Sequence, residues 1–350
     1  MQDLLAEVRE SIATVLDEQC SSLAVHGFTD GRNALDQELQ SLVAELGWLA
    51  ISLPEASGGI GLGSQGLAVL NYELGRASAP GSFLATSVAV EALARSEAAG
   101  AEPIAGLIAD VVAGSVTLAL SASMDVQRTD GAVWLLGDAS AKSALIAGEG
   151  DDIELIDLDA SKAEQLRIWD DTRSVISFPM SACKKVMTLR GLRPTLVSLY
   201  ALALAADSAG AARGTLDRTI AYMKEREQFG RPIGSFQALK HRAADHQVNA
   251  KGADELVWQA AEQIDASLPG ALLWSVMAKA NVTEVAARIA GDCVQLHGGV
   301  GFTCEYDPHL FLKRVRLDEM LLLPNGALRD EAARAFADAL GNDDDVLEIA

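Results

Sequence analysis

The sequence predicts a mainly α-helical protein with a small β domain in the middle of the chain, because the spacing of its apolar residues changes twice. The first third and the last part carry apolar residues at helical spacing, whereas short apolar runs separated by turns lie between them. We expect helices at about 3–20, 33–46, 64–77, 82–97, 103–113, 195–225, 235–264, 270–291, 307–322 and 327–340. We expect strands at about 116–120, 132–136, 143–147, 153–158 and 173–178.

These two changes divide the chain into three predicted domains. They are an N-terminal α-helical domain at 1–114, a middle β domain at 115–190 and a C-terminal α-helical bundle, of the four-helix type, at 191–350. The predicted strands recur at roughly ten-residue spacing with turn residues between them, which favours a small antiparallel barrel or sandwich.

Charge and composition exclude several classes of function. The formal net charge is −21, with acid concentrated at 149–159 and 342–345, so the surface repels nucleic acid and anionic membranes. No apolar run approaches the roughly 20 residues needed to span a bilayer. The four cysteines show neither metal-type nor disulfide-type spacing, and the first residues lack the basic start of a signal peptide. We therefore expect a cytoplasmic protein with no metal site, no membrane insertion and no nucleic-acid partner.

Two loops between predicted helices have an unusual composition. The first glycine loop, residues 226–237, combines arginine, glutamine and phenylalanine with two glycines and a proline. The second glycine loop, residues 295–302, contains three glycines, a glutamine and a histidine. Glycines let a backbone approach a ligand closely, and cations with backbone N–H groups bind phosphates, so both loops are candidates for binding one anionic ligand.

Three stretches, taken in order and at their spacing, resemble the acyl-CoA dehydrogenase family, and the resemblance covers essentially the whole chain. They are residues 47–59, residues 226–245 and residues 295–302 with the following Lys313-Arg314 pair. The resemblance implies FAD as the cofactor and the α,β-desaturation of an acyl-CoA thioester as the reaction. It also implies an electron acceptor, which in this family is usually an electron-transfer flavoprotein.

The resemblance assigns cofactor contacts to both glycine loops. Arg226 would contact the FAD pyrophosphate, and the residues around the adenosine end would be Gln228, Phe236 and Gln237. Residues of the second loop would face the same ligand, namely Gln295, Gly298 and Gly299. In this family such groups reach across a subunit interface to an FAD seated mainly in a neighbouring subunit. His297 is expected to be a hydrogen-bonding loop residue without a chemical role.

The catalytic base of the family has no counterpart that the sequence identifies. Most members carry a Glu shortly after the C-terminal helix, a place that corresponds here to residues 321–324, and a minority carry it on the long helix, where Tyr200 stands. Neither place holds an acid. We expect Asp318 and Glu319 to be exposed helix residues, and Asp207 lies about two turns beyond Tyr200. Tyr200 would need a large fall of its pKa to act as a base, so we assign no catalytic residue.

The middle domain departs from the family as well. Its members carry a Thr-Glu-Pro…Gly-Ser-Asp loop that holds the edge of the flavin ring and the thioester. The corresponding residues 118–125 contain neither proline nor glycine, and the segment after Trp134 is shortened. The groups that would hold a flavin ring in this chain's own pocket are thus altered, whereas the two glycine loops are intact.

This asymmetry favours a subunit of a heteromeric enzyme. In such an enzyme a second acyl-CoA dehydrogenase-like chain supplies the Glu and the flavin pocket, as in the α2β2 enzymes of actinobacterial steroid side-chain β-oxidation. Bulky acyl-CoA thioesters, such as steroid side-chain CoA esters, are then a candidate substrate class. Two alternatives stay open: a self-sufficient homo-oligomeric dehydrogenase with a displaced base, and a non-enzymatic scaffold that kept the fold.

Overall fold

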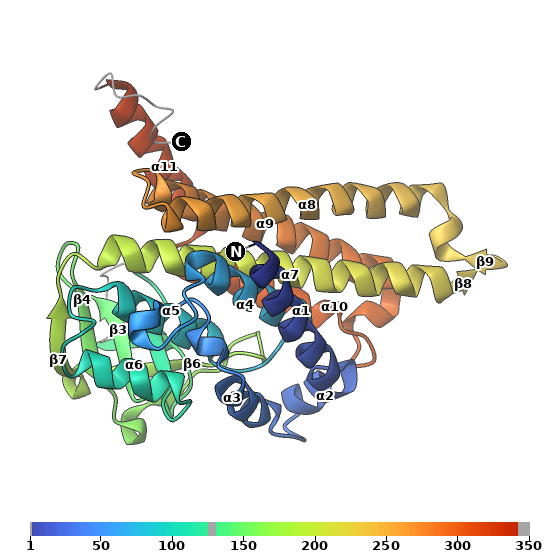
Figure 1. The fold of residues 1–350 in the computed structure, drawn as a ribbon. Helices are drawn as coiled ribbons and strands as arrows, with labels where there is room; N and C mark the ends of the chain where they lie inside the picture. Colours follow the sequence, from blue (N-terminus) through green and yellow to red (C-terminus); the bar gives the residue numbers. More distant parts are fainter. Residues whose placement is uncertain (1, 125–130, 342–350) are drawn as a thin grey trace.

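The computed structural model describes residues 2–124 and 131–341. It is mainly helical with one larger sheet, which confirms the predicted fold class (Figure 1). Two features of the sequence, Asp125 and the acidic segment 342–345, lie outside the described residues. The three predicted domain ranges stay a prediction, although the type of element changes close to their limits.

The N-terminal part contains six α-helices. They are α1 (Gln2–Gln19), α2 (Ser22–Thr29), α3 (Leu35–Glu45), α4 (Gly63–Ala77), α5 (Phe83–Arg95) and α6 (Ile104–Val112). Five of them lie where the apolar spacing predicts helices. The spacing does not predict α2, a helix of eight residues whose start is stabilised by the Ser21 hydroxyl, which accepts a hydrogen bond from Ala24 N.

The middle part forms a seven-stranded sheet in the order β5-β6-β2-β1-β3-β4-β7. Its strands are β1 (Leu118–Ser121), β2 (Ala132–Leu136), β3 (Ser143–Ala147), β4 (Ile153–Asp157), β5 (Glu164–Gln165), β6 (Val175–Pro179) and β7 (Lys184–Leu189). The expectation of a purely antiparallel sheet is wrong, because β1 and β3 pair in parallel, with Leu118 opposite Ser143 and Leu120 opposite Leu145. Strands β2 and β3 lie on opposite sides of β1. Strand β2 runs antiparallel to β1, and the chain then crosses to the other side of β1, where β3 runs parallel to it.

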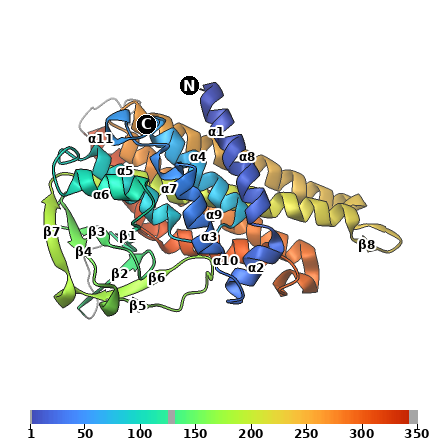
Figure 2. The same cartoon turned by 60° about the horizontal axis from the view of Figure 1, so that its bottom comes forward.

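The C-terminal part consists of five helices and a small hairpin. The helices are α7 (Arg193–Glu225), α8 (Gln237–Asp265), α9 (Ala271–His297), α10 (Pro308–Met320) and α11 (Asn325–Gly341), and β8 (Glu227–Gln228) pairs with β9 (Arg231–Pro232). Helices α7, α8 and α9 run side by side along the molecule (Figure 1). The seven-stranded sheet lies at one end of these helices and the hairpin at the other (Figures 1 and 2).

Helix α7 is the central element of the core. Its first half is rich in alanine, a strong helix former, and Pro194 occupies its first turn, where no backbone N–H is needed. Among the described residues, α7 is the one helix long and apolar enough to cross a membrane. By length and composition, the expectation from the sequence that no stretch could span a bilayer is therefore wrong. However, 89% of the apolar window is buried, so α7 packs as a core helix inside the protein.

Helices α4 and α7 approach each other backbone to backbone. A Cβ atom on Gly210 would lie 1.8 Å from Tyr72 O, and one on Gly75 would lie 2.0 Å from Asp207 O. Because no side chain other than hydrogen fits these positions, the glycines set the distance between the N-terminal helices and the bundle. This close approach also fixes the position of the α7 side chains next to the sheet.

Candidate functional site

The first glycine loop forms a tight hairpin that projects from the end of α7. Gln228 pairs with Arg231 across β8 and β9, and the two residues of the turn, Phe229 and Gly230, have positive φ angles of 53° and 77°. Phe229 is 93% exposed. A positive φ is uncommon for a phenylalanine, and a fully exposed aromatic ring gains nothing from folding in the isolated chain. The hairpin is therefore built to present a side chain outwards.

Phe236 lies at the base of this hairpin. The Arg231 guanidinium carbon is 4.0 Å from the centre of its ring, and the Phe229 ring meets it edge-on at a centroid distance of 6.3 Å. Its neighbour Ser235 has a buried hydroxyl without a hydrogen-bond partner among the described residues. A buried polar atom without a partner is uncommon in a native structure and marks a place where a ligand or water can bind. Gln237 is the exposed first residue of α8.

The second glycine loop starts later than predicted. Helix α9 continues to His297, so Gln295 is a helical residue, and a short 3-10 helix over Gly298–Phe302 replaces the expected irregular loop. Gly298 has a positive φ of 65°, and a Cβ atom on Gly298 or on Gly299 would meet open space. Gln295, Gly298 and Gly299 are all exposed.

The structure brings the two glycine loops to the same end of the bundle. The Tyr222 ring, on the last turn of α7, stacks on the His297 ring at a centroid distance of 4.2 Å and an interplanar angle of 16°. Tyr222 lies one turn before Arg226, and His297 directly precedes Gly298. Sequence reasoning missed Tyr222, because its helical spacing alone does not distinguish it from a core residue.

The place of the family's usual base is closed by backbone hydrogen bonds. Leu322, in the middle of the segment 321–324, donates from its N–H to Ala122 O and accepts from Met124 N, both at 2.9 Å. By the resemblance, these two partners belong to the segment predicted to correspond to the family's flavin-holding loop. The Leu322 side chain is fully buried, and its φ is positive, at 68°. We call this contact between residues 122–124 and 321–323 the seam.

A buried lysine, which sequence reasoning also missed, holds the segment that carries the seam. Lys279 of α9 donates to Glu319 O at 3.0 Å, to Leu323 O at 2.8 Å and to Asn325 Oδ1 at 2.9 Å. Burial lowers the pKa of the Lys279 ammonium to about 8. The signal for it was a lone cation in an apolar stretch of helix, between Met277 and Ala280.

The acids weighed as displaced bases are bound in ion pairs. The expectation that Asp318 is exposed is wrong: it is fully buried, pairs with Arg173 and accepts a hydrogen bond from the Ser208 hydroxyl at 2.7 Å. Asp207 is also fully buried and pairs with Arg173 at 2.6 Å and with Arg314 at 2.7 Å. Both aspartates lie on the inward faces of their helices, where the arginines compensate their charge.

Of the three buried groups weighed as bases, Asp318 alone has a pKa shifted toward the range of a general base, and its buried ion pair with Arg173 is what opposes that role. Desolvation by burial raises the pKa of Asp318 to about 7, whereas the guanidinium groups of Arg173 and Arg314, acting against desolvation, lower that of Asp207. Burial raises the pKa of Tyr200 well above its usual value, which excludes the large fall that a tyrosine base requires. Glu319 is partly exposed and pairs with Arg316 at 2.6 Å.

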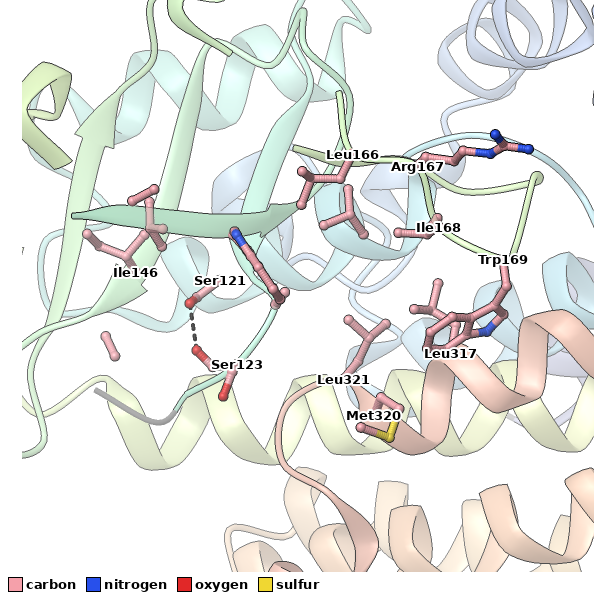
Figure 3. A pocket seen from close by; sticks show the side chains of 16 residues that line it. Ser121, Ser123, Ile146, Leu166, Arg167, Ile168, Trp169, Leu317, Met320 and Leu321 are labelled. Carbon is pink, nitrogen blue, oxygen red and sulfur yellow. Dashed lines mark hydrogen bonds between the residues drawn. The ribbon is translucent and has the colours of Figure 1, made fainter. Parts of the chain in front are cut away.

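A cavity of about 530 Å³ lies between the sheet and the end of α10 (Figure 3). Its lining is mostly apolar and includes two tryptophans, Trp134 and Trp169, together with Leu317, Met320 and Leu321. The indole N–H of Trp169 donates to Lys313 O at 3.1 Å, and the Ser121 hydroxyl donates to Ser123 O at 2.6 Å, so both donors are already used within the protein. Among the described residues of this lining, Arg167 is the one that carries a charge.

The helical N-terminal part, the mixed sheet and the long-helix bundle define a member of a flavoenzyme fold class, and the comparisons with known proteins give the family. Residues 3–105 match the acyl-CoA dehydrogenase N-terminal domain, and residues 197–335 match the acyl-CoA dehydrogenase C-terminal domain. The chain belongs to the acyl-CoA dehydrogenase family, whose members are FAD-dependent enzymes.

Individual relatives agree with this result. The chain is 32% identical to acyl-CoA dehydrogenase IpdE2 of Mycolicibacterium smegmatis, over 91% of this chain and 94% of that protein. It is 35% identical to acyl-CoA dehydrogenase FadE34 of Mycobacterium tuberculosis, over 83% of this chain but 40% of that protein. Among solved structures, a variant of the Tcur3481-Tcur3483 steroid ACAD superposes with a TM-score of 0.86 and 25% identity, over 97% of this chain and 99% of the solved chain.

The residues present fit one end of FAD better than the other. At the end of the bundle, Arg226 forms no side-chain hydrogen bond or ion pair among the described residues, and amide groups and the Ser235 hydroxyl lie in the same loop. This donor set suits a pyrophosphate and an adenosine. At the seam, by contrast, two segments bond to each other directly. The assignment of the seven loop residues as FAD contacts stays a prediction.

Proposed function

We propose that this chain is a subunit of a heteromeric FAD-dependent acyl-CoA dehydrogenase. In this proposal the two glycine loops contribute contacts to the ADP part of an FAD whose ring is seated in a partner chain of the same family. The partner also supplies the catalytic Glu. An α2β2 assembly is the expected form.

The seam is the observation that carries this proposal. A flavin ring and a thioester need space and hydrogen-bond partners between the base-bearing segment and the flavin-holding loop. Here Leu322 stands in the segment that the resemblance assigns to the base, and its backbone bonds join this segment directly to Ala122 and Met124. Arg226, at the other end of α7, is exposed and its side chain has no polar partner among the described residues, which supports a role toward a cofactor held outside this chain's own pocket.

The comparisons support a paired arrangement. The segment aligned with FadE34 makes up 83% of this chain but 40% of FadE34, so that relative is about twice as long and has room for a second chain of this size. The solved steroid ACAD carries two component names, Tcur3481 and Tcur3483. We infer a bulky CoA thioester, such as a steroid side-chain ester, as the substrate class.

The chemistry divides between the two chains in this proposal. A Glu of the partner chain would remove the proton from the carbon next to the thioester carbonyl, and a bound FAD would supply the acceptor for the hydride of the following carbon. An acceptor such as an electron-transfer flavoprotein would reoxidise the cofactor. This chain's residues bind and orient the phosphate and adenosine groups, which places the ring of the cofactor in the partner's pocket.

Flavin content tests the proposal directly. The chain is purified alone and after co-expression with an acyl-CoA dehydrogenase-like chain encoded beside it, and the flavin absorbance per protein is measured. We expect little flavin in the single chain and one FAD per pair of chains in the complex. Full flavin occupancy together with turnover by the single chain would contradict the proposal and support a self-sufficient dehydrogenase. No flavin in either preparation would support a scaffold.

The 530 Å³ cavity is the observation that favours the self-sufficient alternative, because it lies beside the seam and is large enough for a ligand. If the single chain does turn over, the displaced base is found among the acids beside the seam. Activity of the single chain that disappears in Asp318→Asn but persists in Glu319→Gln would assign that role to Asp318.

A further inference from the structure

We propose that Tyr222 and His297 form an aromatic latch that fixes the two glycine loops relative to each other, and that both are positioning residues for FAD binding. This inference rests on the proposed function, because it takes the loops to be the FAD contacts. Neither residue is one of the predicted contacts; each acts through the loop next to it.

The two rings are held in one geometry by several contacts. They stack at 4.2 Å with an angle of 16°, and the Tyr222 hydroxyl lies 3.5 Å from His297 O. His297 Nδ1 lies 2.8 Å from Cys293 O. Because a carbonyl oxygen only accepts, Nδ1 carries the proton and donates, which fixes the plane of the imidazole. Tyr306 closes the pair, with its ring edge-on to Tyr222 at 5.2 Å.

The latch lies at the end of a tightly packed interface between α7 and α9. Thr215, Thr219 and Tyr222 share one face of α7, at spacings of four and three residues, and Cys293 and His297 share one face of α9. The thiol of Cys293 is buried between the helices, and burial raises its pKa to about 11. Since this interface is close-packed, a ring at its end has little freedom to move.

Each ring is coupled to one loop by the backbone. The N–H of Arg226 donates to Tyr222 O at 2.8 Å, and the N–H of Ile233 donates to Arg226 O at 2.8 Å. On the other side, the N–H of Gly298 donates to Gln295 O, which closes the last turn of α9 around His297. A movement of either ring therefore displaces the residues that would contact the phosphates.

The purpose of such a latch follows from the exposure of the loops. Phe229 and Phe302 are 93% and 74% exposed, so the loops are not held by burial of their own side chains. Two exposed loops on different helices would lose conformational freedom when they bind one ligand together. A stacked pair that orders them beforehand reduces this entropy loss and tightens binding.

The latch is tested in the complex with the partner chain. FAD is removed, and its rebinding is followed by flavin fluorescence for the wild type, Tyr222→Leu, His297→Leu and His297→Phe. The matched control is His241→Leu, at an exposed position of α8. We expect Tyr222→Leu and His297→Leu to weaken FAD binding about three- to tenfold. His297→Phe keeps a ring and should restore most of the affinity, and His241→Leu should bind as the wild type does.

Three readouts separate a positioning role from a structural one. The melting temperature of the single chain and the fraction of assembled complex should stay unchanged in His297→Gln, which removes the ring but keeps an amide donor for Cys293 O. This variant also replaces the Leu variants if they fail to fold, and it should weaken FAD binding to the same extent. Wild-type affinity in Tyr222→Leu and His297→Gln, or a loss in His297→Phe as large as in His297→Leu, would overturn the latch alone. A wild-type complex without flavin would overturn the proposed function and the latch together.

Discussion

At the scale of single residues, the buried ion pairs next to the seam are the feature with the largest effect on stability. Asp207 compensates two buried arginines, whereas Asp318 pairs with Arg173 alone. We expect Asp207→Asn to lower the free energy of unfolding by about 3–5 kcal/mol, because it leaves buried guanidinium charge without compensation. Asp318→Asn should cost clearly less. Urea unfolding at pH 7 measures both, and equal losses would contradict this assignment of charge.

The pH dependence of stability gives a second test of Asp318. Its folded-state pKa of about 7 is raised above the ordinary aspartate value of 3.8, so the folded state keeps a proton that the unfolded state has already released. The corresponding contribution to stability is complete below about pH 4 and is lost as the pH rises to 7. The difference in unfolding free energy between the wild type and Asp318→Asn should therefore change across this range and be constant above it. A constant difference from pH 4 to 8 would show that Asp318 has no raised pKa.

The residue scale is also where sequence reasoning failed most clearly. Helical spacing could place Asp318 one turn after Arg314, but it could not show that Arg173, 145 positions earlier in the chain, lies against it. A charged residue on a helix is normally exposed, and burial requires a partner that only the tertiary structure supplies. The absence of an acid at residues 321–324 was visible, but the backbone bonds of Leu322 were not.

At the scale of elements, the crossing of α4 and α7 depends on glycine. Gly210→Ala would place a Cβ atom 1.8 Å from Tyr72 O, a backbone atom that cannot rotate away. We expect this variant to lower the free energy of unfolding by roughly 1–3 kcal/mol through overpacking. Gly252→Ala on exposed α8 is the matched control, since its Cβ meets open space, and it should raise stability by about 0.5–1 kcal/mol. Thermal unfolding of both variants gives the comparison, and a neutral Gly210→Ala would show that the two helices can separate.

The elements themselves were largely predictable, because long amphipathic or alanine-rich helices carry a strong periodic signal. Their ends and their pairing were less so. The parallel pair β1–β3 depends on which side of β1 the chain returns to, and short strands give no signal for that. The end of α9 was placed too early, because the glycines after His297 appeared to interrupt the helix before Gln295. The hairpin of Glu227 to Pro232 has Phe-Gly in its turn, where asparagine-glycine is the usual signal.

At the scale of the whole molecule, α7 separates two ends with opposite properties. The end at the sheet carries the seam and the buried ion pairs, while the end at the hairpin carries the exposed side chains of Arg226 and Phe229. A self-sufficient homo-oligomer of the family would need the first end open as well as the second. In the proposed heteromer, the second end completes the partner's cofactor site without any change in the core of this chain.

Hydrogen exchange can show which end meets the partner. We expect backbone amides at 226–236 and 298–303 to exchange quickly in the single chain and to become protected in the complex with partner and FAD, because exposed hydrogen bonds open with little free energy. Amides at 118–124 and 321–323 should be protected equally in both states, since the seam is already formed, and the buried first half of α7 serves as the internal reference. Protection that increases at the seam and stays unchanged at the hairpin would mean that the cofactor enters this chain's own pocket, and the heteromeric proposal would then have to be abandoned.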